Sequence, residues 1–108
     1  MLQSLEVLGI RQAVLTSQDG LVIDSVGESS PEPELLAAEL AALLRSSQTL
    51  TKTLGGQLKR LTLATDSREV LAVIFGQYCL GAVVDKGADR KGVGSELSRL
   101  ASRLEKTL

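Results

Sequence analysis

The sequence has no histidine, no tryptophan and a single cysteine, Cys79, among its 108 residues, and its aromatic residues are Phe75 and Tyr78. Without histidine, the chain cannot use the Ser-His-Asp or Cys-His groups of nucleophilic catalysis. One cysteine supplies neither the several ligands of a usual zinc site nor a disulfide framework, which suits a reducing compartment. We therefore predict no catalytic residue, no cofactor site and no metal site, and a cytoplasmic location.

A large net charge and a long hydrophobic run are also absent. Twelve basic residues against thirteen acidic ones give a net charge of −1, so no bulk field draws the chain to nucleic acid or to an anionic membrane. The apolar runs are far shorter than the roughly 18 residues of a membrane-spanning helix, and the N-terminus lacks the pattern of a signal peptide. We expect no nucleic-acid partner and no membrane span.

Aliphatic residues in short, patterned runs make up most of what the sequence does contain. Hydrophobic residues account for 44% of the chain, enough for one largely aliphatic core, and a chain of this length has no room for two. We predict a single domain over residues 1–108.

The first hairpin is the clearest local pattern. Asp19 and Gly20 stand between the β-prone runs Ile10–Ser17 and Leu21–Val26. Asp-Gly between two such runs is typical of a hairpin turn, because glycine adopts positive φ without steric cost and aspartate tolerates it.

Three further strands follow in the second half of the chain. Residues Gln57–Thr65 place Leu61 and Leu63 on one face and polar residues on the other, which indicates a strand with one wet side. The nearly continuous apolar runs Val70–Phe75 and Tyr78–Val84 favour a second hairpin in the middle of the sheet. Their small residues would let a helix sit close; these are Ala72, Gly81 and Ala82.

Three segments predict helices, over residues 1–8, Glu34–Leu54 and Ser95–Leu108. The long central one contains no proline or glycine and stops at Gly55-Gly56, a C-terminal signal. The order is therefore αββαβββα. This is an α+β domain with a five-stranded, mainly antiparallel sheet, whose helices we expect to pack on one face.

The central helix carries more apolar surface than one sheet can bury. Nine of the ten residues in Leu35–Leu44 are apolar, whereas a helix lying on a sheet needs about three in seven. The predicted sheet-facing stripe is Leu36, Leu40, Leu43, Ser47, Leu50 and Leu54. The outward set, which we predict to pack against the same helix of a second copy, is Leu35, Ala38, Ala41, Ala42 and Arg45. The alternative is that alanine is present simply as a good helix former on a half-exposed face.

Other candidate chemical groups have plainer explanations. The glycine-rich segment Gly87–Ser95 precedes a helix, but Gly92 is followed by Val93 where a phosphate-binding P-loop has lysine. Asp19 and Asp24 lack a nucleophile, metal or cofactor beside them, and Cys79 has the setting of a buried core residue. An arginine acting on a nucleotide held by a partner protein stays open for Arg45, Arg60, Arg68 and Arg90.

The first hairpin, Ala13–Ser25, resembles the signature of the roadblock/LC7 family, with a short apolar strand, a polar step, Asp19-Gly20 and a second strand before an acidic loop. The rest of the chain agrees in order, from the Ala/Leu-rich helix and its Gly-Gly stop to the C-terminal helix. The resemblance implies an αββαβββα, profilin-like domain that dimerises through its long helix and often through an edge strand.

The same resemblance implies a function. Members of this family bind and regulate small Ras-like GTPases, including the bacterial gliding-type GTPase, or serve as dynein light chains and scaffold subunits, and are not enzymes. We expect a homodimeric interaction module that binds a small Ras-like GTPase and alters its nucleotide cycle by fixing its switch regions. One alternative is a scaffold or motor-associated light-chain subunit. Another is a small-molecule sensor, for which the aliphatic sequence gives little support.

Overall fold

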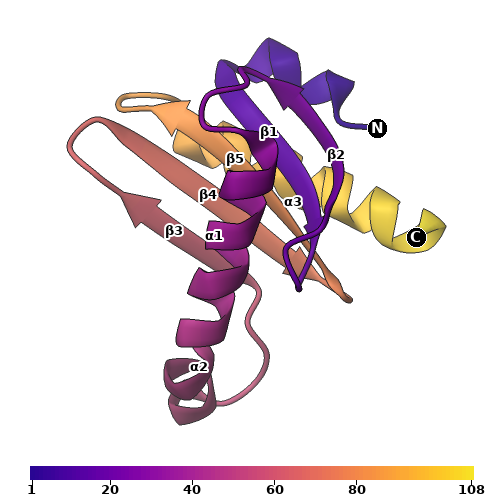
Figure 1. Ribbon diagram of the computed structural model, residues 1–108, viewed down its shortest axis with the longest axis vertical. Coiled ribbons are helices and arrows are strands. Elements are labelled where there is room, and N and C mark those ends of the chain that lie inside the picture. Colours follow the sequence, from indigo (N-terminus) through magenta and orange to yellow (C-terminus); the bar gives the residue numbers. More distant parts are fainter.

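A five-stranded antiparallel sheet forms the centre of the molecule (Figure 1). The computed structural model describes the backbone of residues 1–108 and the side chains of residues 1–5 and 9–108. The strand order is β2-β1-β5-β4-β3, and every neighbouring pair is antiparallel. The strands are β1 Ile10–Ser17, β2 Val22–Gly27, β3 Arg60–Ala64, β4 Arg68–Phe75 and β5 Tyr78–Asp85. The predicted fold class is confirmed.

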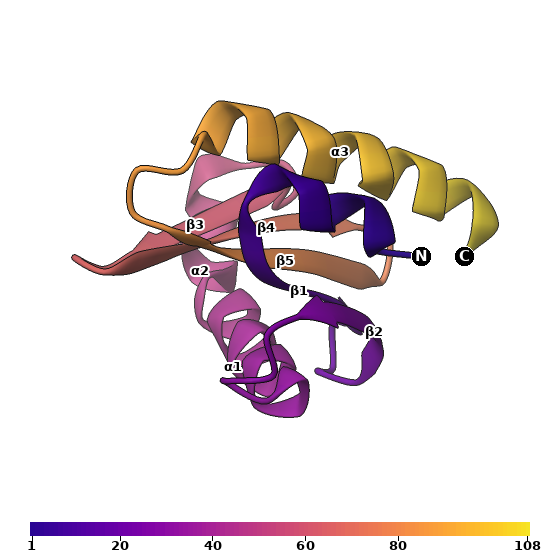
Figure 2. The ribbon, with the colours of Figure 1, turned by 90° about the horizontal axis from the view of Figure 1, so that it is seen from above.

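Helices cover both faces of this sheet, not one. A short 3-10 helix, η1, and the C-terminal helix α3 lie on one face, and α1 lies on the other (Figure 2). The expectation that all helices share one face was wrong, because β5 is buried on both sides along almost its whole length and an apolar strand of this kind needs cover above and below. The helices are η1 Gln3–Leu8, α1 Pro33–Ser46, α2 Gln48–Leu54 and α3 Arg90–Thr107.

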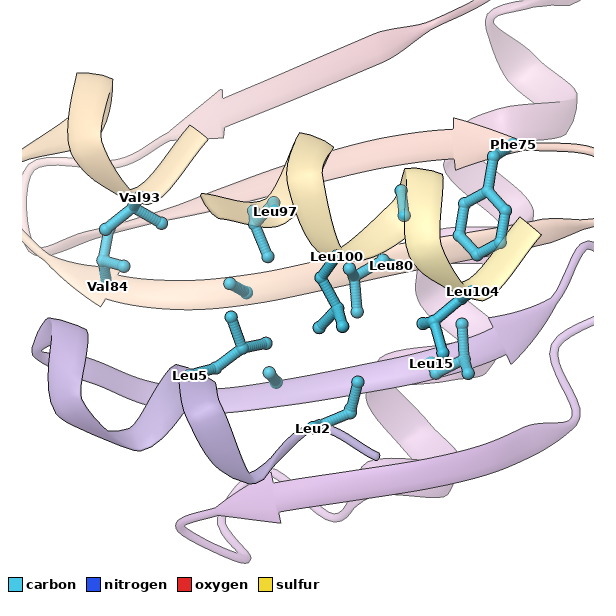
Figure 3. Close-up of a cluster of buried hydrophobic side chains, with 13 residues drawn as sticks. Leu2, Leu5, Leu15, Phe75, Leu80, Val84, Val93, Leu97, Leu100 and Leu104 are labelled. Atoms are coloured by element: carbon cyan, nitrogen blue, oxygen red, sulfur yellow. The ribbon is translucent and has the colours of Figure 1, made fainter. Parts of the chain in front are cut away.

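The two faces carry separate hydrophobic cores. Adjacent residues of β1 point to opposite sides, so that Leu15 enters the core under α3 and Val14 the core under α1. The larger core joins η1 and α3 to the sheet (Figure 3) and includes Leu2, Leu5, Leu80, Leu97, Leu100 and Leu104. The smaller core joins α1 to the sheet and consists of Val14, Leu36, Leu40, Leu44, Ala72, Cys79 and Val83.

Glycines allow α1 to approach the sheet and the first hairpin closely. A Cβ at Gly81 would lie 2.7 Å from Cδ1 of Leu40, so this strand position must be small, as the sequence predicted. The hairpin turn at Asp19-Gly20 is confirmed, with φ of +93° at Gly20 and its N–H donating to the carbonyl of Ser17 at 3.0 Å. A Cβ at Gly20 would lie 3.3 Å from Cα of Ala38, so the turn rests directly on α1.

Less of the central helix covers the sheet than its sequence predicts. It divides at Ser47, where the hydroxyl groups of Ser46 and Ser47 bond back to carbonyls one turn earlier, a pattern that bends helices. The second piece, α2, has no buried residue among those described and runs past the end of the sheet (Figure 1). Leu50 and Leu54, predicted to face the sheet, are therefore 62% and 78% exposed.

The C-terminal helix begins earlier than predicted. It starts at Arg90, inside the glycine-rich segment that was expected to precede it, because the Asp89 carboxylate caps it by accepting the N–H of Gly92 at 3.0 Å. Its buried residues lie at helical spacing and are Val93, Leu97, Leu100, Ala101 and Leu104.

We expect Gly81→Val to lower the free energy of unfolding by about 1 to 3 kcal/mol, because the added methyl groups displace the buried Leu40 side chain and push α1 off the sheet. Gly94→Ala in α3 is the control, since its added Cβ meets no atom within 4 Å and alanine is the better helix former. Urea unfolding measures both. An unchanged value for Gly81→Val contradicts the close approach of α1.

Candidate interaction surface

The outward side of α1 is a shallow surface of small residues with charged flanks, which we call the α1 face. It consists of Leu35, Ala38, Glu39, Ala42 and Arg45, all exposed. Leu35 leaves 52% of its area in water. Ala41, which the sequence placed in the outward set, is only 2% exposed, because its methyl group faces the Gly20 turn of the first hairpin. The other four residues of the predicted dimer interface do face outward.

The position of this face is fixed by contacts on the inner side of α1. Leu36, Leu40 and Leu44 enter the smaller core. The chain entering the helix is held by Gln12 of β1, which is 1% exposed and donates from Nε2 to the Pro31 carbonyl at 2.7 Å. The helix is therefore held along its length and at its N-terminal approach.

Charge is unevenly distributed along α1 and α2. Glu32, Glu34 and Glu39 lie in the N-terminal half, whereas Arg45 and Lys52 lie toward the C-terminal end. Glu34 in the first turn of α1 and Arg45 in its last turn are each at the helix end where the backbone dipole favours their charge. The result is an exposed surface that is acidic at one end and basic at the other.

One of the two outer edges of the sheet is β3. This strand pairs only with β4, so its other side presents unpaired backbone N–H and C=O groups. Leu61 and Leu63 lie on one face of the strand, as predicted; Leu61 packs against the smaller core, and Leu63 is 48% exposed.

The remaining candidate residues have structural roles. Asp24 accepts the N–H of Leu2 at 3.2 Å and lies 3.7 Å from the terminal ammonium, so it anchors the N-terminus. Asp19 is part of the exposed hairpin turn. At the start of α3, the Asp89 carboxylate occupies the backbone N–H that a bound phosphate would need. Burial raises the pKa of the Cys79 thiol to about 11, which leaves it protonated and unreactive at neutral pH.

Arg68, one of the candidate arginines, belongs to a group of ion pairs at one end of the sheet. Arg11 of β1 donates to both oxygens of Asp85 at 3.1 Å and to Glu28 at 2.8 Å and 3.2 Å. The Nε of Arg68 lies 3.8 Å from Asp85. The two carboxylates hold the pKa of Arg11 above its ordinary value. These ion pairs connect the ends of β1, β4 and β5 with the residue that follows β2, and they give Arg68 a carboxylate partner within this chain.

The described surface includes a larger and a smaller groove. The larger, about 670 Å³, lies between α2, residues 57–59 and the turn between β4 and β5. The smaller, about 330 Å³, lies between α3 and strands β3 and β4, and brings together Arg60, Arg90 and Lys91. The sequence pattern presented Arg60 and Arg90 as separate residues and did not predict this grouping, because 30 residues separate them in the chain.

Among the described residues, no three His, Cys, Asp or Glu side chains group as metal ligands, and no described helix is long and apolar enough to span a membrane.

The sequence model of the roadblock/LC7 domain matches residues 1–85. Similar solved structures include Myxococcus xanthus MglB, with a TM-score of 0.87 at 18% identity over 96% of this chain and 88% of that one. An MglB with a tetrameric arrangement has a TM-score of 0.81 at 20% identity over 95% and 79% of the two chains. The gliding protein MglB of Thermus thermophilus has a TM-score of 0.79 at 22% identity over 95% and 80%. No curated protein matches the chain.

The order of elements, the hairpin turn and the matched residues all define the same class of domain. The chain belongs to the roadblock/LC7 family, as its first hairpin indicated.

Proposed function

We propose that the chain is a non-enzymatic cytoplasmic homodimer that binds a small Ras-like GTPase and alters its nucleotide cycle. Membership of the roadblock/LC7 family, whose members the sequence resemblance links to GTPase regulation, supports the choice of partner. The observation that supports the dimer is the α1 face, which exposes the small residues Ala38 and Ala42 on a helix whose inner side packs in the smaller core. We also propose that residues 1–108 form one domain, with α3 completing the sheet's cover beyond the matched residues.

The α1 face has the composition of a close helix–helix contact. Ala38 and Ala42 are one turn apart and carry only a methyl group each, so a second helix could approach to near backbone distance. Leu35 would then be withdrawn from water, a contribution of about 1 to 2 kcal/mol for each copy. Because a two-fold axis uses the same face twice, the single strip supplies both halves of the interface.

The charges favour antiparallel packing of the two helices about Ala42. Glu39 lies three residues before Ala42 and Arg45 three residues after it, so an antiparallel pair brings each Glu39 near the Arg45 of the other copy. A parallel pair would set like charges opposite each other. Exposed pairs contribute only about 0.2 to 1 kcal/mol each, so here they select orientation, and the apolar contact supplies affinity.

We expect Ala42→Arg to convert the dimer into a monomer, because two long cationic side chains would meet at the symmetry axis. Light scattering after size-exclusion chromatography at micromolar concentration measures the mass. Ser102→Arg, an exposed position of α3, is the matched control and should remain dimeric. A wild-type chain that is monomeric under these conditions removes the basis of the proposal.

Charge-reversal variants test the antiparallel orientation of the two α1 helices. Glu39→Arg and Arg45→Glu should each weaken the dimer about tenfold, since each places like charges near one another twice across the interface, and the double variant should recover most of the loss. Sedimentation equilibrium at two salt concentrations gives the dissociation constants. If the double variant loses as much dimerisation free energy as the two single variants combined, the antiparallel arrangement about Ala42 is wrong.

Action on the GTPase is tested by adding the dimer to each Ras-like GTPase encoded in the source genome and measuring single-turnover GTP hydrolysis and nucleotide release. We expect one GTPase to bind and to change at least one of these rates about tenfold or more, well within the range that fixed switch regions and a supplied charge can give. Ala42→Arg, as a monomer, tests whether dimerisation is needed. Binding of a GTPase with both rates unchanged favours the scaffold or light-chain role, and no binding to any of them contradicts a GTPase partner.

A further inference from the structure

The smaller groove, between α3 and the β3–β4 edge of the sheet, has an apolar floor and a cationic rim. Its volume is about 330 Å³. Leu71 and Val73 of β4 line it and are only half buried. They are therefore apolar residues that α3 leaves partly uncovered. Helix α3, which forms one wall of the groove, lies on the side of the sheet opposite α1 (Figure 2), and no residue of the α1 face lines the groove.

Every charged residue among those described as lining the groove is a cation, namely Arg60, Arg90 or Lys91. The Nη2 of Arg60 reaches across from β3 and donates to the Ser98 hydroxyl of α3 at 3.1 Å. Arg90 is partly neutralised, with Nε 3.3 Å from the buried carboxylate of Glu69. Among the described side chains, no carboxylate pairs with Arg60 or Lys91. A positive potential therefore remains over an apolar floor.

Gly94 keeps the groove open. It lies inside α3, where glycine costs about 1 kcal/mol relative to alanine, and it lines the groove. A Cβ built there meets no atom within 4 Å, so the packing of this chain against itself does not require glycine. The empty space beside Gly94 is room for a side chain of another molecule.

We propose that this groove binds an extended acidic segment of a partner protein, with its apolar side chains on Leu71 and Val73 and its carboxylates on Arg60 and Lys91. An extended chain alternates its side chains between two sides, which suits a floor of one character and a rim of another. A single-stranded nucleic acid fits less well, because none of the described lining residues is aromatic and bases need a stacking platform. The partner need not be the proposed GTPase.

Fluorescence anisotropy of the full chain with a labelled peptide of alternating glutamate and valine tests this site. We expect binding that is at least about tenfold tighter than that of the matching glutamine–valine peptide and that weakens with salt. Lys91→Glu and Arg60→Glu should each weaken it about tenfold. Gly94→Leu, which changes no charge, should weaken it by a similar factor because it fills the groove.

Two control variants distinguish peptide binding in the groove from attraction to positive charge elsewhere on the surface. Arg103→Glu changes an exposed cation of α3 that does not line the groove, and Gly94→Ala adds only a methyl group; both should bind within about twofold of the wild type. Circular dichroism confirms that each variant is folded. The proposal is overturned if the two peptides bind equally, if Arg103→Glu loses as much as Lys91→Glu, if Gly94→Leu loses nothing, or if oligo-dT binds more tightly than the acidic peptide.

Discussion

Burial of β5 on both sides is the constraint on which the rest of the structure depends. The strand lies at the centre of the sheet, and six of its eight residues, Cys79–Val84, are buried. An apolar strand of this kind is stable only when each face of the sheet is covered. With three main helical segments available, the chain places α3 and η1 on one face and α1 on the other. Both candidate surfaces follow, because each is the outer or lateral side of one of these covering helices.

The small residues of the sheet and turn set how closely α1 can lie. Gly81 removes the side chain that would collide with Leu40, and Gly20 lets the first hairpin rest on the helix backbone. The helix is consequently in contact with the sheet and with the turn of the first hairpin, and its inner leucines lie in the smaller core. What remains outside is the α1 face, with the small residues Ala38 and Ala42 among its exposed residues. These small side chains leave room for a second helix to pack closely, and the same helix of a second copy is the partner that we propose.

Local patterns predicted the strands, the Asp19-Gly20 turn and the fold class, because alternation and turn chemistry act within a few residues. Contacts between distant segments were not predictable in this way. Ala41 was assigned to the outward side because Gly20, whose turn covers it, comes 21 residues earlier in the chain. Leu50 was assigned to the sheet because nothing in the helix pattern shows where the sheet ends. The continuous apolar run of β5 did carry the signal for helices on both faces, but the hairpin connections suggested a single covered face. The grouping of Arg60 with Lys91 exists only once α3 lies beside β3.

The near-zero net charge conceals an uneven distribution of charge over the surface. Three of the glutamates, Glu32, Glu34 and Glu39, lie at or beside α1, while Arg60, Arg90 and Lys91 gather at the α3 groove. Such fields fall off over roughly 10 Å in salt, so each surface acts on what touches it and not on the other. The sheet therefore separates the two surfaces that we propose as binding sites. Self-association through the α1 face, as proposed, would leave the α3 groove open to a second protein.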